Sequence, residues 1–259
     1  MRSITFLKSA LLKLNSVLLR ILNYSWHDSS RFRGELKTFK DLGGIVSDVS
    51  PMFDDWNGSA GQASGHYFHQ DLLVAQQIHE RKPRRHLDFG GRFDGFVAHV
   101  ASFRHIEVCD IRDMSDPIKN FSFLRADLLD AKDYEITDSL SCLHSIEHIG
   151  LGRYGDSIDP QGHLKAFKNL VKMLEVGGIL YISFPIARES QVVFNKHRIF
   201  EPREILRWDS GQITLKLNRF DFVDDSGKIH TLCEINDAVN EKLTYGCGIY
   251  TLEIGRAHV

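Results

Sequence analysis

The chain has 259 residues, of which 42% are hydrophobic and 25% charged, and its formal net charge is −2. This is ordinary globular composition, with enough chain to bury one sizeable core in a domain of about 190 residues plus an extension. A near-neutral charge gives no global electrostatic case for nucleic acid, so we predict no nucleic-acid partner.

The first 26 residues predict an amphipathic helix. Apolar residues recur there at three- and four-residue steps, namely Ile4, Leu7, Leu11, Leu14, Leu18 and Ile21. Lys8, Lys13 and Arg20 interrupt the apolar run, so a membrane span is not predicted. Such a helix packs on its own domain or on a protein partner, which we favour, or lies peripherally on an anionic membrane.

We divide the chain into three parts. Residues 1–63 are predicted to hold the N-terminal helix and a linker, and residues 64–253 the main domain. The last six residues, 254–259 (IGRAHV), resemble the translation of a common sequencing-adapter read, and we expect a non-native tail there.

The four cysteines form no CxxC pair and lie in apolar stretches. Buried free thiols are typical of a reducing compartment, so we predict a cytoplasmic protein.

The main domain predicts helices alternating with short apolar strands. A first helix is expected from Ser64, its cap, with Phe68, Leu72, Ala75 and Ile78 facing inward. Strands are expected at 86–90, 105–111, 121–128, 139–146, 179–186, 213–223, near 229–235 and at 248–252. Further helices are expected at 95–103 and before Gly177-Gly178. The alternation predicts an α/β fold, a Rossmann-like doubly wound and mostly parallel sheet.

The turn after the first strand is rich in glycine. Asp88 ends the strand, Gly90 and Gly91 follow, and a helix begins near Gly95. Glycine lets a ligand approach the backbone, and the start of a helix offers free amides and a partial positive charge. Taken alone, the same pattern also fits a tight turn without a ligand.

Two acidic residues follow the next two strands. Asp110 can accept hydrogen bonds from both hydroxyls of a ribose, although it can equally pair with Arg112. Asp127 can contact an adenine amino group, or be a simple turn residue. The other residues that we predict to bind the cofactor are Asp88, Gly90, Gly91, Arg92, Ile111 and Leu128.

Together these motifs resemble those of class I S-adenosylmethionine (SAM)-dependent methyltransferases over residues 83–252. The segments His144–Ile149 (HSIEHI) and Leu174–Leu180 (LEVGGIL) resemble the family's fourth strand and the turn before its fifth. The pattern at 65–72, 150–156 and 194–200 resembles an uncharacterised domain family of that fold. The resemblance implies SAM as cofactor.

One residue departs from the methyltransferase pattern. Arg92 stands where the family's glycine-rich loop carries a second glycine. Either the loop lies further from the cofactor, or Arg92 contacts the methionine carboxylate. The spacing of Gly90, Arg92 and Gly95 also resembles a damaged dinucleotide fingerprint, so NAD stays a minor alternative.

Three histidines are candidates for catalysis. Methyl transfer requires alignment of the acceptor, and a hydroxyl acceptor also needs a base to take its proton. His144 and His148 are expected where the fourth strand ends, and His197 after the fifth. We favour His148, then His197; each histidine could also be purely structural.

The glycine-rich loop at 150–156 is a candidate lid over the acceptor. Arg153, Tyr154 and Asp156, with the later Arg198, are predicted to bind it, the arginines gripping a carboxylate or phosphate. Arg153 can alternatively form a surface ion pair. The acidic residues near His163 could suit magnesium or calcium, but acidic loops are usually just solvated, so we predict no metal site.

These residues predict a SAM-dependent methyltransferase that methylates an oxygen atom of a small molecule or a glycan. The glycan preference rests on the polar strand ends, which carry histidine and arginine, and on the lack of a recognised nucleic-acid or peptide motif. The alternative is a catalytically inactive module of the same fold in a membrane-associated biosynthetic complex. Arg92 and the basic N-terminal helix motivate that alternative.

Overall fold

The computed structural model describes residues 26–56, 58–114, 119–130, 136–208 and 213–255. The chain divides into two compact units, Met1–Gln62 and Ala63–Val259. The N-terminal helix expected from the sequence lies outside the described residues up to residue 25, and so do the last four residues of the predicted tail. Ile254, the first residue of that tail, is buried as the last residue of a strand.

The first unit contains helix α2 (Trp26–Asp41) and a 3-10 turn, η1 (Phe53–Trp56). The sequence predicted a linker here, and over residues 27–41 that prediction was wrong. Ion pairs between side chains four residues apart, Arg31 with Glu35 and Lys37 with Asp41, support a polar helix on its exposed face. None of the described helices in the chain is both long and apolar enough to cross a bilayer.

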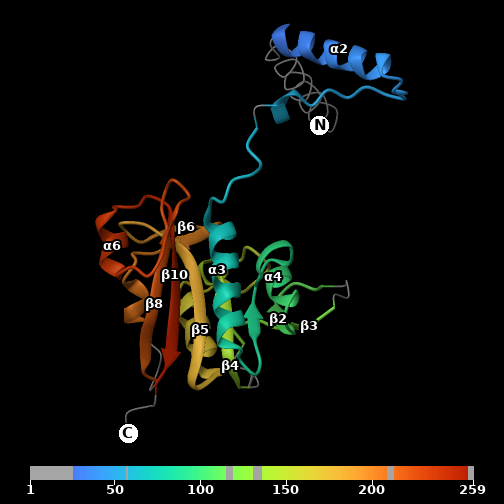
Figure 1. Ribbon diagram of the computed structural model, residues 1–259. Coiled ribbons are helices and arrows are strands. Elements are labelled where there is room, and N and C mark those ends of the chain that lie inside the picture. Colours follow the sequence, from blue (N-terminus) through green and yellow to red (C-terminus); the bar gives the residue numbers. More distant parts are fainter. Residues whose placement is uncertain (1–25, 57, 115–118, 131–135, 209–212, 256–259) are drawn as a thin grey trace, which may run out of the picture. The chain divides into compact units, whose positions relative to one another are not determined.

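In the described part of the second unit, eight strands form one sheet in the order β3-β2-β1-β4-β5-β10-β8-β9 (Figure 1). The strands are β1 (Leu87–Phe89), β2 (Ile106–Asp110), β3 (Phe121–Arg125), β4 (Thr137–Leu143), β5 (Leu174–Ile186), β8 (Leu215–Val223), β9 (Ile229–His230) and β10 (Gly246–Ile254). The first five run parallel, whereas β10 runs antiparallel to both β5 and β8. This confirms the predicted Rossmann-like, mostly parallel sheet.

Helices cover both faces of the sheet and create two apolar cores. Alternate residues of β5 point to opposite faces, so Leu180 and Ile182 belong to one core and Ile179 and Tyr181 to the other. Helix α5 (Gly162–Lys172) packs in the first core, and α3 (His66–Arg81) and α4 (Ala98–Ala101) in the second. Figure 1 shows α3 and α4 on the same face. Strands buried on both sides explain the near-continuous apolar runs.

Shorter elements frame the end of the sheet where the parallel strands finish. They are η2 (Phe93–Val97, a π-helical turn), η3 (Ile146–His148), η4 (Glu204–Arg207), α6 (Ile235–Asn240), and a separate antiparallel pair, β6 (Gln191–Val193) with β7 (His197–Ile199).

Helix α3 differs from the prediction in its cap and its buried face. Its N-cap residue is Gly65, with φ +90° and no side-chain cap, while Ser64 donates to the Gly227 carbonyl instead. Phe68 and Leu72 are 46% and 39% exposed. The buried residues are Gln70, Asp71, Val74, Ala75 and Ile78. Gln70 faces the sheet, where it accepts a hydrogen bond from Ser183 Oγ and donates one to Asp71.

Helix α5 ends before the glycine pair that was predicted to close it. Its last residue is Lys172, and Leu174 already pairs with Thr137 of β4. Pairing then resumes at Ile179 opposite Ser139, so the residues between bulge from the strand. Gly177, with φ +82°, therefore serves a bulge in β5 rather than a helix end.

Candidate functional site

A cleft opens where the parallel strands end, and its position follows from the strand order. The order reverses between β1 and β4, whose following turns lead in opposite directions and leave a crevice. The cleft holds about 570 Å³ of empty space, part of which is open to solvent. Its lining consists of Phe89, Gly90, Cys109, Asp110, Ile111, Arg112, Ala126, Asp127, Leu128, His144, Ser145, His148, Ile149, Tyr154 and Asp156.

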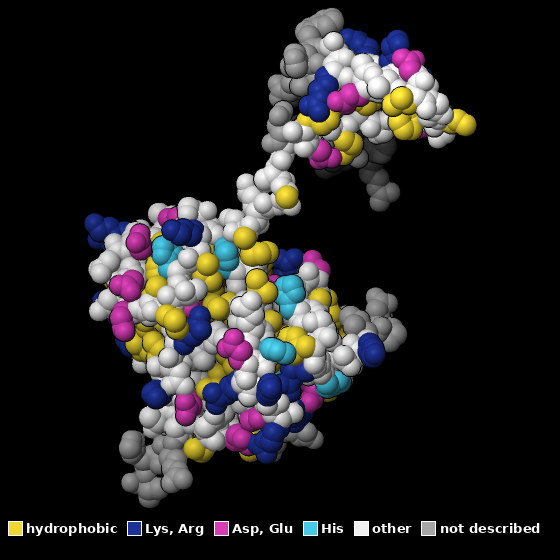
Figure 2. All heavy atoms as spheres, viewed as in Figure 1, with side chains coloured by type: hydrophobic (Ala, Val, Ile, Leu, Met, Phe, Trp, Pro, Cys, Tyr) yellow, Lys and Arg dark blue, Asp and Glu magenta, His cyan; other side chains and the backbone are white. Residues whose placement is uncertain are grey.

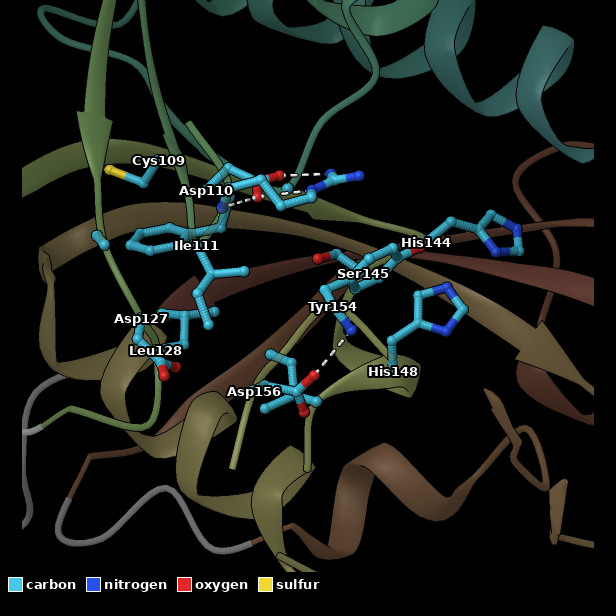
Figure 3. A pocket seen from close by; sticks show the side chains of 15 residues that line it. Cys109, Asp110, Ile111, Asp127, Leu128, His144, Ser145, His148, Tyr154 and Asp156 are labelled. Carbon is cyan, nitrogen blue, oxygen red and sulfur yellow. Dashed lines mark hydrogen bonds and ion pairs between the residues drawn. The ribbon is translucent and has the colours of Figure 1, made fainter. Parts of the chain in front are cut away.

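Figure 3 shows how the cleft is divided. Asp110, Ile111 and Leu128 gather at one end and His148 lies at the other, with Tyr154 between them. The structure therefore brings together residues predicted for the cofactor and residues predicted for the acceptor.

The turn after β1 forms one wall of the cleft. Gly90 has φ +72°, and a Cβ atom on it would overlap the Ser145 side chain. At Gly91 a Cβ would overlap the carboxylate of Asp88. Close packing thus requires glycine at both positions. Of Asp88, Gly90 and Gly91, only Gly90 lines the cleft.

Asp88 lies beneath the cleft in a buried polar chain. Its carboxylate accepts a hydrogen bond from Ser141 Oγ at 2.5 Å, and Ser141 is in turn 3.1 Å from His86 Nε2. Burial raises the pKa of Asp88 to about 7 and lowers the pKa of His86 to about 3. Asp88 therefore supports the turn, through a hydrogen bond from the Gly91 backbone, and does not line the cleft.

Asp110 ends β2 and is held by Arg112. The guanidinium donates to both carboxylate oxygens, at 2.9 and 2.6 Å, and stacks at 4.5 Å over the Tyr154 ring. Arg112, which the sequence offered as an alternative partner of Asp110, therefore does pair with it. The backbone N–H of Arg112 also donates to Asp110 Oδ1 at 2.8 Å, so of the carboxylate's roughly four acceptor positions about one is left for a hydroxyl donor from the cleft.

Asp127 follows β3 and faces the same end of the cleft. Its Oδ1 accepts the backbone N–H of Leu129 at 2.9 Å, which fixes the carboxylate in its turn. Ile111 and Leu128 add apolar surface beside it. Apolar walls with a few fixed polar groups are what a flat heterocycle joined to a ribose requires.

His148 has the hydrogen-bond pattern of a base. Its Nδ1 lies 2.7 Å from the Lys196 carbonyl, which only accepts, so we assign the proton of the neutral ring to Nδ1. The lone pair is then on Nε2, which lies 3.6 Å from a Glu147 oxygen and 3.4 Å from the Arg153 guanidinium, a hydrogen-bond donor. Burial lowers the pKa of His148, which keeps the ring neutral near neutral pH.

His144 follows the last residue of β4 and has φ +47°. Its Nδ1 is 2.9 Å from Glu147 Oε1, and both side chains are buried. Burial alone would lower the pKa of His144, but Cys247 and Glu147 raise it well above its usual value. Burial likewise opposes ionisation of Glu147, whose pKa is nevertheless lowered by His144 and His148.

The loop at 150–156 is organised by its own aspartate. Asp156 accepts the backbone N–H groups of Gly150 and Gly152, at 2.7 and 3.1 Å, and of Tyr154 at 3.2 Å. The ring of Tyr154 meets His148 edge to face at 5.6 Å. Asp156 thus shapes the loop, and Tyr154 presents its ring to the cleft.

Four other predicted residues lie outside the cleft lining. Arg92 pairs with Asp94 and lies 4.6 Å over Tyr67. Arg153 donates to the Lys196 carbonyl at 2.9 Å. His197 is buried, with its ring 5.5 Å from that of Tyr245.

Arg198 is the fourth of these residues, and it is buried. It donates to the carbonyls of Glu147, Ile149, Asp159 and Pro160, at 2.7 to 3.4 Å. Arg198 therefore holds the loop that contains His148 in place. Its donors point to backbone carbonyls rather than to the cleft, where the sequence predicted that Arg198 binds an anionic acceptor.

Side chains suited to a metal ion come together away from the acidic loop that the sequence analysis considered for magnesium or calcium. Among the described residues, Asp156, Asp159 and His163 form no cluster, and Asp159 is paired with Lys165. His66, His144 and Cys247 instead place one ligand atom each within 4.8 Å of one another. Sequence spacing could not reveal this group because its members lie far apart in the chain.

The chain is only distantly similar to the known proteins with which it was compared. Residues 125–207, less than half of the chain, match a family model described as "Caenorhabditis protein of unknown function, DUF268". That segment includes the cleft residues from Asp127 to Asp156. A search of curated proteins finds no significant match.

Three of the solved structures to which the chain is similar are methyltransferases, and another is the [4+2]-cyclase SpnF. A SAM-dependent methyltransferase from Clostridium acetobutylicum is 13% identical, with TM-score 0.49, over 73% of this chain and 92% of that chain. The N-methyltransferase NodS from Bradyrhizobium japonicum, in complex with S-adenosylhomocysteine, is 14% identical, with TM-score 0.46, over 83% and 97%. An O-methyltransferase from a polyketide synthase of Brevibacillus brevis is 12% identical, with TM-score 0.49, over 72% and 71%.

Likenesses this distant identify no substrate, and the strand order of the chain itself carries the fold assignment. The parallel strands in the order β3-β2-β1-β4-β5, with β10 antiparallel beside them, give the chain a Rossmann-like, mostly parallel sheet.

Proposed function

We propose that the chain is a SAM-dependent methyltransferase with its cofactor in the cleft between the turns after β1 and β4. The observation that carries the proposal is the convergence of Gly90, Asp110 and Asp127 on one cleft. Their spacing along the sheet suits a nucleoside: Asp110 for the ribose hydroxyls, Asp127 for the adenine amino group, and Gly90 for close approach of the backbone.

The acceptor side of the proposal rests on His148. SAM supplies a methyl group on a sulfonium, so one carbon–sulfur bond breaks as the bond to the acceptor forms. For a hydroxyl acceptor, His148 Nε2 takes the proton that the oxygen loses, and the Glu147 carboxylate 3.6 Å away stabilises the resulting charge. Tyr154 and Asp156 border the space in which the acceptor would lie.

We further propose a small molecule or a glycan as acceptor. The cleft lies at the carboxyl end of the parallel strands, where sheets of this kind bind small ligands, and charges of both signs are interspersed on the face shown in Figure 2, without a basic stripe. Incubation of the purified protein with labelled SAM and cell extract, followed by identification of the labelled product, would identify the acceptor class.

Calorimetric titration with SAM and with S-adenosylhomocysteine tests the cofactor proposal. We expect micromolar binding that Asp110→Ala abolishes. Asp113→Ala is the matched control, because Asp113 lies just beyond the same strand and its side chain is 76% exposed. No binding at millimolar cofactor, or equal binding by both variants, would reject the proposal.

One observation favours the inactive-module alternative. Arg112 already engages both oxygens of Asp110, which a catalytically silent descendant would tolerate. The same titration separates the two, since the inactive module binds neither compound. Titration with NADH in parallel tests the dinucleotide alternative.

A further inference from the structure

Three side chains suited to a soft metal ion meet beside the candidate cofactor cleft. They are His66 at the start of α3, His144 just after β4, and Cys247 near the start of β10. We propose that His66, His144 and Cys247 form a zinc site with one open coordination position.

The topology explains why residues so distant in sequence meet here. β4 and β5 are parallel, so His144 lies near the end of β5. β10 runs antiparallel to β5, which pairs Cys247 with Pro185 at that same end. The first residue of α3 lies over this edge, and the His66 and His144 rings stack at 5.3 Å.

The outer ring nitrogen of His144 is the strongest indication that these side chains bind a metal ion. Nε2 is buried and has no hydrogen-bond partner of good geometry, and Cys247 is the neighbour with which the ring interacts besides Glu147. In Figure 3 the His144 ring points away from Asp110 and Asp127. A buried, unpaired polar atom is costly, and a metal ion would satisfy it.

The two histidines already have hydrogen-bond partners of the kind that orient a metal-binding ring. Glu147 Oε1 lies 2.9 Å from His144 Nδ1, so the carboxylate orients the ring and leaves Nε2 for a metal. The backbone of Tyr245 is a hydrogen-bond partner of the His66 ring. Glu147 is itself fully buried, which suits a group that balances positive charge on an adjacent ion.

The donor set identifies the metal by its chemistry. Two imidazoles and one thiolate favour zinc over the hard ions magnesium and calcium, which select oxygen. Three protein ligands with a vacant fourth position are typical of zinc sites that bind water or a substrate. On binding, the Cys247 thiol and any protonated ring nitrogen release their protons to solvent.

The three atoms need only a small movement to reach coordination distances. They lie within 4.8 Å of one another, whereas tetrahedral zinc ligands lie roughly 3.3–3.6 Å apart. His66 is half-buried and begins its helix, so rotation of its side chain can close the gap. Its exposed edge also gives the ion a path from solvent.

Metal analysis of the full chain tests the site without any assay of activity. We expect one zinc per chain after purification without chelator. After its removal, zinc titrated against a chromophoric chelator should bind with one-to-one stoichiometry. Cobalt alone should produce the visible bands of tetrahedral Co²⁺ and a thiolate-to-cobalt band in the near ultraviolet.

Variants distinguish this site from adventitious binding. His66→Gln and Cys247→Ser should each weaken zinc binding by about 100-fold or more, and Cys247→Ser should also abolish the thiolate band. His99→Gln, at an exposed histidine, and Cys233→Ser, at a cysteine outside the cluster, should bind as the unmodified chain does.

The proposal is overturned if the folded chain binds no stoichiometric zinc, or if the control variants weaken binding as much as the site variants do. Selective retention of copper or iron on the same ligands would overturn the assignment to zinc. His66→Gln guards against misfolding as an explanation, because this residue is the least buried of the three. The result does not depend on whether the chain binds SAM.

Discussion

The side chain of Ser145 fills the space that a Cβ atom on Gly90 would occupy. This contact joins the turn after β1 to the turn after β4, the two turns that bound the candidate cofactor cleft. Any side chain on Gly90 would push these turns apart.

Replacement of Gly90 by alanine should therefore destabilise the fold and prevent cofactor binding. The left-handed backbone alone costs about 1–2 kcal/mol, and the overlap with Ser145 adds about 1–3 kcal/mol. Gly177→Ala is the control for backbone strain, because Gly177 has φ +82° and open space around its Cβ position. Urea denaturation and calorimetry with S-adenosylhomocysteine measure both effects; equal losses for the two variants would contradict the role of Ser145.

His148→Gln should reduce kcat for an oxygen acceptor by about 10²–10⁴-fold while binding of S-adenosylhomocysteine stays unchanged. Only the neutral ring accepts a proton, so activity is lost as pH falls through the pKa of His148. Burial lowers that pKa, and the acid limb of kcat/KM should lie below about 6.5.

His197→Gln is the matched variant for this test. His197 is also buried but lies outside the cleft, and we expect it to retain the acid limb. Loss of the limb in His197→Gln alone would move the role of base to His197.

Asp88→Asn should change how stability depends on pH. Burial raises the pKa of folded Asp88 to about 7, against about 3.9 when unfolded, so the folded chain holds an extra proton between these values. The contribution of Asp88 to the free energy of unfolding is therefore greatest below pH 4 and decreases as pH rises toward 7. Between pH 5 and pH 7 the unmodified chain should lose at least about 1 kcal/mol relative to Asp88→Asn in urea denaturation. Parallel pH profiles would exclude this linkage.

Arg198→Met should lower the free energy of unfolding by about 2–4 kcal/mol, because it leaves buried carbonyl groups without donors. Arg153→Met, at an exposed arginine, should cost under about 1 kcal/mol. Denaturation curves compare the two. A rise in KM for an anionic acceptor in Arg198→Met, without any loss of stability, would favour the acceptor-binding role predicted from sequence.

Binding of the predicted N-terminal helix to a membrane surface can be tested with anionic lipid vesicles. If the helix lies on a membrane, the full chain should float with anionic liposomes while a chain that begins at Ser64 should not, because the basic residues of the helix are then missing. Equal flotation of both chains would reject a membrane role for this segment.

The sequence by itself determined the sheet and one half of the cleft. Apolar runs interrupted by turns predicted the parallel strands, and glycine or aspartate directly after a strand predicted Gly90, Asp110 and Asp127. These features succeed because the carboxyl ends of parallel strands meet at one edge, whatever the details of packing.

Tertiary structure alone decided which polar side chains face the cleft. Arg198 and Arg153 belong to the same chemical class, yet one is buried under backbone carbonyls and the other is exposed. Likewise, the antiparallel pairing of β10 brings Cys247 to His144 and His66, residues that no local pattern connects. The direction and proximity of a side chain depend on strand pairing and helix rotation, which are set by the packing of the whole core rather than by neighbours in the chain.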